Sequence, residues 1–314
     1  MAALRVGLLD FGFPRIESSA TGTTVFIGER LSDTIEVVER ADRLGFTRFW
    51  LGEHHGPGMS FGGSPELLLP VLAGRTDTIR VGVAAVLVDY KNPFEVACDF
   101  TLLERLFAGR IDMGVCRSRA DGDAHMALGG DPAMVGLFPE ASHVSKVERL
   151  MGFLRGKLPE SDPHHDVPVN PAVTVPCQTW MCGGRLASSL AGRLGTSLCV
   201  SHFHNGKGAN PADVVSYRAS FVPSEECPKP VVAIGVCGAV VKSAADVHAA
   251  RAGWYQPFYP PNLVGTPAEW KVFLTELVAK FGVDEVVLLD ILDDRAARLW
   301  GIEALAEVAS TVTV

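Results

Sequence analysis

The chain has 314 residues, of which 47% are hydrophobic and 20% are charged, a balance typical of a globular protein that buries a sizeable core. No apolar run approaches the ~20 residues of a membrane-spanning helix, and the N-terminus lacks the flanks of a secretory signal, so we expect a cytoplasmic protein with no membrane partner. The formal net charge of −8 and the scattered Lys and Arg residues argue against a nucleic-acid partner, because binding to phosphates requires basic patches.

Seven cysteines are present, and no two of them form a Cys-x-x-Cys pair. An odd number with this spacing fits neither a zinc clamp nor a disulfide framework. We therefore expect reduced thiols.

Short Val-, Ile- and Leu-rich runs alternate with longer amphipathic stretches along the whole chain, which indicates parallel strands alternating with helices. The predicted strands are Arg5 to Leu9, Thr47 to Leu51, Ile79 to Val83, Arg110 to Val115, Gln178 to Cys182, Thr196 to Val200, Pro230 to Val236 and Asp284 to Leu289. The predicted helices are Ser32 to Leu44, Pro65 to Arg75, Pro93 to Phe107, Arg185 to Leu194 and Pro267 to Phe281. Ser32 or Asp33 can cap the first helix, and Gly45 can end it.

Eight βα units in a chain of this length favour a closed (β/α)8 TIM barrel, in one domain spanning residues 1–314. An open doubly wound sheet is less favoured because no Gly-x-Gly-x-x-Gly segment opens the first helix. We expect the active site on the face formed by the carboxyl ends of the strands. Two stretches, about residues 118–176 and 252–265, are interpreted as loop insertions over this face.

The second of these stretches is rich in aromatic residues and Pro. Trp254, Tyr255, Phe258 and Tyr259 suggest an apolar or aromatic wall of a substrate site, although such a group also occurs as ordinary packing under a loop.

The predicted second strand runs into Gly52-Glu53-His54-His55. A titratable cluster at the end of a barrel strand is expected to be catalytic. A His in this position titrates near neutral pH and can exchange a hydrogen bond with an oxygen, while Glu53 could fix its tautomer. The alternative is a structural Glu–His hydrogen bond in a capped loop.

The predicted fourth strand ends in Cys116, Arg117, Ser118 and Arg119. The planar guanidinium of Arg donates two parallel hydrogen bonds and so suits a phosphate or another anion. Cys116 is either a small buried hydrophobic residue or a reactive thiol whose pKa the adjacent Arg lowers.

The predicted fifth strand ends in Gly183-Gly184-Arg185, and Ser188 follows on a helix. Glycine lets the backbone approach an anion, and the free N–H groups at the start of a helix can bind a phosphate. This turn shares the barrel face with Arg117, so the two segments together predict an anion site.

The predicted sixth strand is followed by His202 and His204. With Glu53 and His54 they raise the alternative of a metal-dependent hydrolase. However, the chain has no His-Glu-x-x-His segment and no convincing carboxylate ligand at the last strand, so we expect no metal. We expect at least one of these two His residues to line a pocket.

Taken together, these segments resemble the bacterial luciferase-like flavin monooxygenases over nearly the whole chain and in the same order. Gly45 to His55 is similar to the family's Gly-Phe-x-x-x-Trp-x-x-Glu-His-His segment. Thr78 to Leu87 and Gly109 to Arg117 resemble its third and fourth strands, and Val169 to Pro171 and Leu263 to Pro267 extend the match. The family fold is a (β/α)8 barrel, which agrees with the strand count.

The resemblance implies a two-component monooxygenase that acts on a small organic substrate and O2. Reduced FMN comes from a separate NAD(P)H:flavin reductase, and one oxygen atom is inserted into the substrate through a flavin C4a-hydroperoxide. We also expect a homodimer. Luminescence is doubtful, because the chain is shorter than the luciferase catalytic subunit where that subunit carries a mobile lid.

The resemblance also assigns roles. His54 is similar to the catalytic His, Cys116 to a reactive thiol beside the flavin, and Arg117 to the Arg that binds the FMN phosphate. Ala84-Ala85 resembles the site of a cis non-proline peptide under the flavin ring.

The phosphate loop departs from the family pattern, because Gly183-Gly184 stand where luciferase has Glu-Ser. Arg185, Ser188 or Ser189 are the substitutes there, and Arg119, His143 or Lys146 are candidates for a second phosphate ligand. The residues expected at the substrate are Glu53, His55, His202, His204 and Trp254.

Three alternatives stay open at the level of sequence. A deazaflavin-dependent oxidoreductase would use the same barrel for hydride transfer. A metal-dependent hydrolase would use His54, His202 and His204. A non-catalytic partner subunit is the third, as one luciferase chain is.

Overall fold

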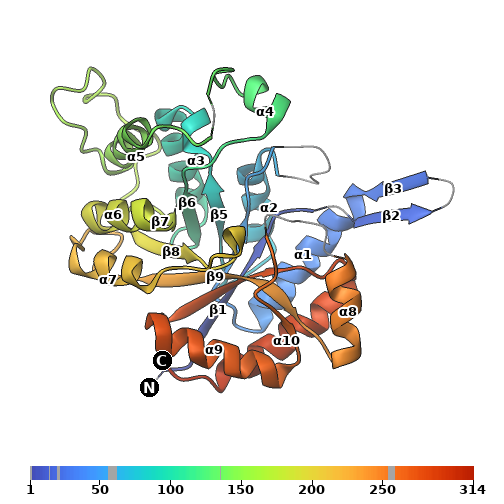
Figure 1. The fold of residues 1–314 in the computed structure, drawn as a ribbon. Helices are drawn as coiled ribbons and strands as arrows, with labels where there is room; N and C mark the ends of the chain where they lie inside the picture. Colours follow the sequence, from blue (N-terminus) through green and yellow to red (C-terminus); the bar gives the residue numbers. More distant parts are fainter. Residues whose placement is uncertain (1, 14, 20–21, 56–61, 135, 254–258) are drawn as a thin grey trace.

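The computed structural model describes residues 2–13, 15–19, 22–55, 62–134, 136–253 and 259–314. Eight parallel strands close into a barrel, and helices cover its outside (Figure 1). In order around the barrel they are β1 (Arg5–Asp10), β4 (Arg48–Leu51), β5 (Arg80–Val86), β6 (Ile111–Val115), β7 (Gln178–Gly183), β8 (Ser197–Ser201), β9 (Val232–Val240) and β11 (Glu285–Asp290). Each overlaps a predicted strand, so the prediction of a (β/α)8 barrel is confirmed.

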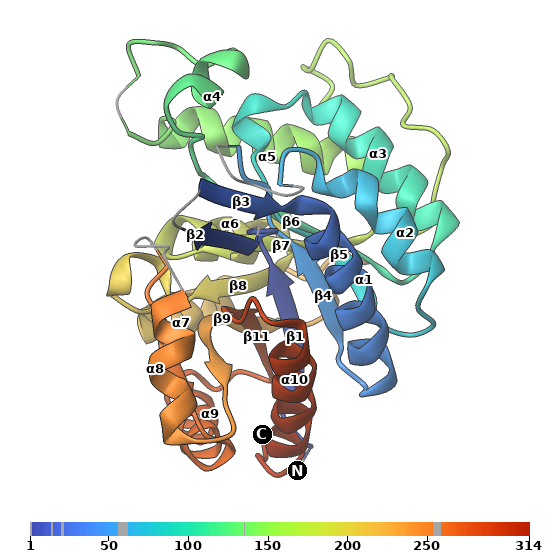
Figure 2. The same cartoon turned by 90° about the vertical axis from the view of Figure 1, so that its right-hand side faces the viewer.

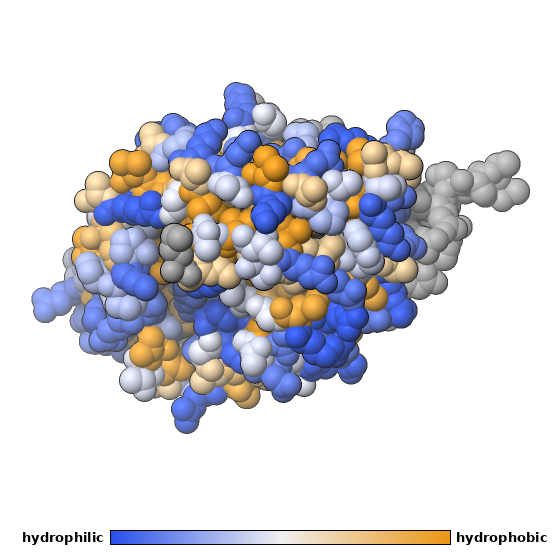
Figure 3. All heavy atoms as spheres, turned by 90° about the horizontal axis from the view of Figure 1, so that it is seen from below, coloured by the Kyte–Doolittle hydropathy of each residue, from blue (hydrophilic) through white to orange (hydrophobic). Residues whose placement is uncertain are grey.

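The barrel closes where β11 pairs with β1. A short strand, β10 (Leu263–Gly265), pairs in parallel with the carboxyl end of β9. The carboxyl ends of the strands point to one end of the molecule, and both termini lie at the other end (Figure 2). Apolar and hydrophilic side chains are interspersed at the end that holds the termini (Figure 3).

The five predicted helices are present. They are α1 (Ile27–Arg43), η1 with α2 (Pro65–Leu68 and Leu69–Gly74), α3 (Pro93–Leu106), α6 (Arg185–Leu194) and α9 (Pro267–Phe281). The predicted start of α1 is wrong, because the helix begins at Ile27 and Ser32 and Asp33 lie inside it. Gly45 follows α1 with φ of 79°, a conformation that glycine adopts without steric cost. No described helix is long and apolar enough to cross a membrane.

The remaining elements were not predicted. They are the antiparallel pair β2 (Arg15–Ser19) and β3 (Gly22–Phe26), the short helices η2 (Val88–Tyr90), α4 (Gly122–Ala127) and η3 (His204–Gly206), and the longer helices α5 (Glu140–Arg155), α7 (Pro211–Ala219), α8 (Ala244–Gly253) and α10 (Arg295–Ser310). Helix α5 lies within the stretch interpreted as a loop insertion, packs against α3 and stands between β6 and β7 in the chain. Its buried face includes His143, Val147, Leu150 and Leu154, a helical spacing that the sequence contains.

Side chains on the barrel strands alternate between the helices and the barrel interior. Leu8 and Leu51 belong to the layer packed against the helices, whereas Leu9, Trp50 and Trp180 belong to the interior cluster. The rings of Trp50 and Trp180 meet edge to face with centroids 5.2 Å apart. The interior is therefore filled with side chains, and open space for a ligand has to come from the strand ends.

A buried ionic group ties the strands together inside the barrel. The Arg48 guanidinium pairs with both Asp112 and Glu285, with 3.1 Å from Nη2 to Oε2 of Glu285. Asp112 also accepts hydrogen bonds from Trp50 Nε1 at 2.9 Å and from Arg80 Nε at 2.7 Å. Burial by itself would raise the pKa of Asp112, but the charges of Arg48 and Arg80 lower it below its ordinary value. The carboxylate is consequently ionised in the folded protein.

We expect Asp112→Asn to lower the free energy of unfolding by about 3 kcal/mol, because it leaves two guanidinium groups without their shared counter-charge. The pKa of Asp112 is lower in the folded than in the unfolded chain, so its contribution is present at neutral pH and is lost as the pH falls below about 4. Urea unfolding followed by circular dichroism measures the difference. Glu303→Gln is the control, because it removes a half-exposed pair with Arg40 and should cost less than about 1 kcal/mol. Equal stability of the two variants would contradict this account of the interior.

Candidate functional site

The Gly52-Glu53-His54-His55 segment leaves β4 at the carboxyl end of the barrel. Gly52 is required there, because a Cβ at this position would collide with the ring of Phe11. Glu53 is 3% exposed. Its carboxylate accepts from Leu87 N at 2.9 Å and pairs with His55 Nε2 at 2.8 Å and with Lys91 Nζ at 3.4 Å. Glu53 therefore fixes His55 rather than His54, and it ties the end of β4 to the segment that follows β5.

His54 points into a different environment from its two neighbours. Its Nε2 lies 2.7 Å from the hydroxyl of Tyr259, and its ring centroid lies 4.4 Å from that of Phe11. Its Nδ1 is buried and has no hydrogen-bond partner among the described residues. Burial, helped by the nearby His204, lowers the pKa of His54 to about 4. The imidazole is therefore neutral at physiological pH.

Aromatic side chains from several strand ends surround His54. We call this group the mouth cluster; it consists of Phe11, Phe13, His54, Phe203, His204 and Tyr259. Tyr259 lies at its centre, with ring centroids 5.1 Å from Phe11, 5.8 Å from Phe203 and 5.3 Å from His204. The cluster gives the end of the barrel an apolar surface that contains two imidazoles, and burial lowers the pKa of each to about 4.

The two His residues after β8 point in different directions. His204 stacks on Phe203 with centroids 4.6 Å apart and hydrogen-bonds to Ser201, so it joins the mouth cluster. His202 points outward: its Nδ1 accepts from Ala209 N at 2.9 Å and its ring meets Phe281 of α9 edge to face at 5.7 Å. His202 is not brought together with His54. Trp254 lies outside the described residues, as do Tyr255 and Phe258.

Sequence reasoning did not single out Phe11, Phe13 or Phe203. Phe11 and Phe13 come directly after β1, so their strand-end position was the available signal. Tyr259 belonged to the suggested aromatic wall, but its contact with His54 joins residues 205 positions apart in the chain. No local pattern predicts such a contact.

Small residues line the neighbouring ends of β5 and β6. The Ala84–Ala85 peptide bond is cis, as the resemblance implied. Beside it, a Cβ on Gly114 would come within 2.7 Å of the carbonyl oxygen of Val83 and 3.0 Å of Ala84 Cα. Only glycine therefore fits at position 114 without a shift of the backbone next to Ala84–Ala85.

Cys116 follows β6 and lies close to the Glu53 carboxylate. Burial, with the negative charges of Glu53 and Asp89, raises the pKa of Cys116 to about 12. The idea that the adjacent Arg lowers this pKa is wrong, because the Arg117 guanidinium points to Glu140, with 3.3 Å from Nη1 to Oε1. The thiol is consequently protonated at neutral pH and is a poor nucleophile.

A pocket of about 290 Å³ lies beyond Cys116, between the ends of β6 and β7. Arg117, the Gly183-Gly184 turn and Arg185 line it, together with Glu140 and His143. Gly183 has φ of 146°, and Gly184 stands at the N-terminus of α6. Glu140 Oε1 lies 3.3 Å from both the Arg117 and the Arg185 guanidinium. Two guanidinium groups and a helix N-terminus are groups that bind anions in proteins, and here both guanidinium groups pair with the Glu140 carboxylate.

The other candidates for a phosphate ligand are differently engaged. Ser188 is buried, and its hydroxyl donates to Gly184 O at 3.1 Å. His143 lines the pocket but pairs through Nδ1 with Asp89 at 2.8 Å. Lys146 donates to the carbonyl of Asp89, whereas Arg119 Nε is buried without a partner among the described residues. Arg117 and Arg185 are therefore the better placed cations.

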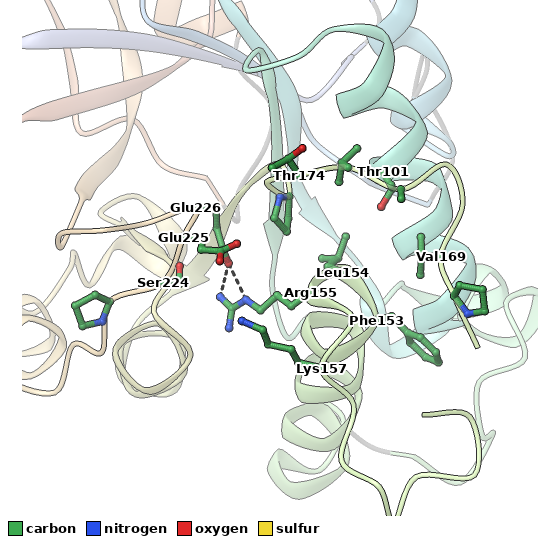
Figure 4. A pocket seen from close by; sticks show the side chains of 16 residues that line it. Thr101, Phe153, Leu154, Arg155, Lys157, Val169, Thr174, Ser224, Glu225 and Glu226 are labelled. Atoms are coloured by element: carbon green, nitrogen blue, oxygen red, sulfur yellow. Dashed lines mark hydrogen bonds and ion pairs between the residues drawn. The ribbon is translucent and has the colours of Figure 1, made fainter. Parts of the chain in front are cut away.

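A larger cavity of about 390 Å³ lies elsewhere on the molecule (Figure 4). Residues that precede β7 and β9 line it, and its Arg155 and Glu226 side chains form an ion pair. None of the predicted site residues lies in it, so it is separate from the strand ends that carry the candidate chemistry. Within the described ranges, no three His, Cys, Asp or Glu side chains are grouped so that they could hold a metal ion.

Comparison with known proteins identifies the family. The family model described as luciferase-like monooxygenase matches residues 4–272. The uncharacterised protein YwcH of Bacillus subtilis (strain 168) is 30% identical over 223 residues, which are 69% of this chain and 65% of that protein. The N-acetyl-S-alkylcysteine monooxygenase of the same strain is 30% identical over 193 residues, 61% of this chain and 57% of that protein. The aligned region covers less than two thirds of either relative.

Solved structures share the barrel at low sequence identity. Apo-MsnO8 has a TM-score of 0.79 at 23% identity and covers 97% of this chain and 98% of its own. The oxygenating constituent of 3,6-diketocamphane monooxygenase from Pseudomonas putida, in complex with FMN, has a TM-score of 0.71 at 16% identity, with 99% of both chains covered. An F420-dependent secondary alcohol dehydrogenase has a TM-score of 0.69 at 14% identity, again with 99% of both chains covered. Because the family model spans most of the sequence and these structures have the same fold, the chain belongs to the luciferase-like monooxygenase family.

Proposed function

We propose that the chain is an FMN-dependent monooxygenase of the two-component type. A separate NAD(P)H:flavin reductase supplies reduced FMN, and one oxygen atom of O2 is inserted into a small organic substrate. The observation that carries the proposal is that an anion pocket and a neutral, buried His lie on the same face of the barrel. Cys116 lines the anion pocket, and the small residues at the ends of β5 and β6 lie on the same face.

The anion pocket fits the phosphate end of FMN. Arg117 and Arg185 converge on the Glu140 carboxylate, and a phosphate has the charge to take the place of that carboxylate against both guanidinium groups. The Gly183-Gly184 turn exposes the N-terminal N–H groups of α6 on the same side. Arg117 and Arg185 would therefore hold the phosphate, with the backbone of the turn as the second element.

The mouth cluster fits the other end of the cofactor and the substrate. The buried Nδ1 of His54 has no partner among the described residues, which leaves one hydrogen-bonding position for a bound group. Reduced FMN, when bound, supplies the electrons with which O2 is reduced. His54 holds a hydrogen bond at the reacting oxygen, and the surrounding rings exclude water.

The chemistry of the mouth cluster points to an uncharged, apolar or aromatic substrate. Its rings offer apolar area and its two His residues offer hydrogen bonds, while the carboxylate next to His54 in the chain, Glu53, is occupied by His55, Leu87 N and Lys91. A charged substrate would lose its hydration here without gaining a counter-ion.

We expect Arg117→Ala to weaken FMN binding about 10-fold to 100-fold, because it removes a charge-assisted hydrogen bond to the phosphate. Anaerobic fluorescence titration with FMN and with riboflavin, which lacks the phosphate, measures the effect. Riboflavin affinity should not change. The matched control is Arg193→Ala at the far end of α6, where an exposed pair with Glu148 is lost.

An equal loss of affinity for FMN and riboflavin would contradict the assignment of the pocket to the phosphate. The F420-dependent structural neighbour makes a deazaflavin the specific rival cofactor. The same titration with F420 decides between them: tighter binding of F420 than of reduced FMN would replace the proposed reaction with hydride transfer.

We also propose that two copies of the chain associate through η1, α2 and α3, which flank the neighbouring strands β4, β5 and β6. Leu67 and Leu106 are 74% and 60% exposed, and Leu102 and Val71 are 48% and 44% exposed. Leu102 and Leu106 are four residues apart and share one face of α3. These four exposed apolar side chains are the basis of the proposal, because a contiguous apolar patch is typical of contacts between proteins.

Sedimentation velocity tests this assembly. The wild-type chain should sediment as a dimer, and Leu102→Glu with Leu106→Glu should shift it to a monomer because two charges would be buried at the contact. Val215→Glu is the control, since Val215 is 66% exposed on α7. A monomeric wild-type chain, or a double variant that remains dimeric, would contradict the proposal.

A further inference from the structure

We propose that Tyr259 is a positioning residue for His54. The Tyr259 hydroxyl donates to His54 Nε2 and thereby keeps the ring proton on His54 Nδ1. The inference rests on the proposed function, in which His54 makes a hydrogen bond to the reacting oxygen. Tyr259 determines which nitrogen of the His54 ring carries the hydrogen that is donated to this oxygen.

The contact between the two side chains is short and lies among aromatic rings. Tyr259 Oη and His54 Nε2 are 2.7 Å apart, and their rings lie edge to face with centroids 5.9 Å apart. Phe11 packs against both rings, at 4.4 Å from His54 and 5.1 Å from Tyr259. The phenol and the imidazole are therefore held against each other in an apolar setting, where a hydrogen bond is stronger than in water.

Tyr259 is fixed in this position through its own backbone. The carbonyl of Tyr259 accepts from Cys237 Sγ at 3.5 Å. Three residues later, Asn262 bonds to β9 twice: its N donates to Cys237 O at 2.7 Å, and its Oδ1 accepts from Cys237 N at 2.9 Å. Asn262 Nδ2 also donates to His202 O at 3.0 Å. The segment that carries Tyr259 is thus attached to Cys237 within β9 and to His202 just after β8.

Both partners are neutral in the folded protein. Burial raises the pKa of Tyr259 to about 12 and lowers the pKa of His54 to about 4. No proton is transferred between them near pH 7, so the hydrogen bond alone selects the tautomer. A phenol is a better donor and a poorer acceptor than an imidazole, so the hydroxyl donates and Nε2 accepts.

The other candidate for this role is already engaged. Glu53 could have fixed the tautomer of His54, but its carboxylate pairs with His55 and Lys91. With Nε2 held by Tyr259, Nδ1 carries the hydrogen, and Nδ1 is the ring atom that is buried without a partner among the described residues. A buried donor without a partner is costly, and a ligand oxygen is the group that would satisfy it.

The experiment is a ¹⁵N NMR measurement of the His side chains near pH 7 in the wild type and in Tyr259→Phe. The wild type should show His54 as the Nδ1–H tautomer, and Tyr259→Phe should give a mixture with the Nε2–H form, since the ring packing stays while the hydroxyl is lost. The resonance of His54 is assigned with His54→Gln. Tyr90→Phe is the matched control, because Tyr90 makes an equivalent bond to His125 Nδ1 at 2.6 Å and should leave the His54 signals unchanged.

Two NMR results would overturn the inference: an Nε2–H form of His54 in the wild type, or an unchanged tautomer in Tyr259→Phe. The second measurement is the oxidation of protein-bound reduced FMN by O2 in a stopped-flow spectrometer. Tyr259→Phe should change its rate constant about 10-fold, and Tyr90→Phe should not change it. If the His54 tautomer shifts as expected while neither Tyr259→Phe nor Tyr90→Phe binds reduced FMN, Tyr259 still positions His54. In that case the proposed function is wrong.

Discussion

The position of His54 depends on one buried carboxylate, that of Glu53. It binds the backbone N of Leu87 beyond β5, the ring of His55 and the ammonium of Lys91. A buried anion is stable only when it is paired and hydrogen-bonded, so these three partners fix the segment from Gly52 to His55. His54, which takes no part in this pairing, is left to face the mouth cluster, and the cis Ala84–Ala85 peptide stands in the strand whose end Glu53 ties down.

The candidate site has a charged end and an apolar end. Arg117, Arg185 and the start of α6 form the charged end, where the proposed phosphate would meet both guanidinium groups and backbone donors. The mouth cluster forms the apolar end and holds a neutral imidazole. Cys116 lines the charged end as a protonated thiol. FMN has this same division, with an anionic phosphate at one end and a flat, largely apolar ring at the other.

The sequence allows the barrel to be predicted because each parallel strand is a short apolar run that local patterning reveals. The strand-end position of Gly52-Glu53-His54-His55 and of Arg117 follows directly from that prediction. Helix α5 was overlooked although the spacing of His143, Val147 and Leu150 shows it. The outward direction of His202 also follows from alternation along β8, since Cys199 and Phe203 face the interior.

Other features depend on contacts between distant segments and could not be predicted. Arg117 is next to Cys116 in the chain, but its charge is directed to Glu140 on α5, so sequence adjacency gave the wrong direction for the pKa of the thiol. The partner of His54 is Tyr259, a residue brought close only by the closed barrel and the attachment of its segment to β9.

Oxidation of the protein–flavin complex by O2 shows whether His54 acts on the reacting oxygen, as we have proposed. Protein loaded with reduced FMN is mixed with O2, and the return of the oxidised flavin spectrum is followed in the wild type, in His54→Ala and in His164→Ala, whose His lies half exposed on a distant loop. We expect His54→Ala to regain the oxidised spectrum about 10-fold faster than the wild type, whereas His164→Ala should not differ from it. Equal rates in all three proteins, or a wild-type complex oxidised as fast as free reduced FMN, would contradict the account.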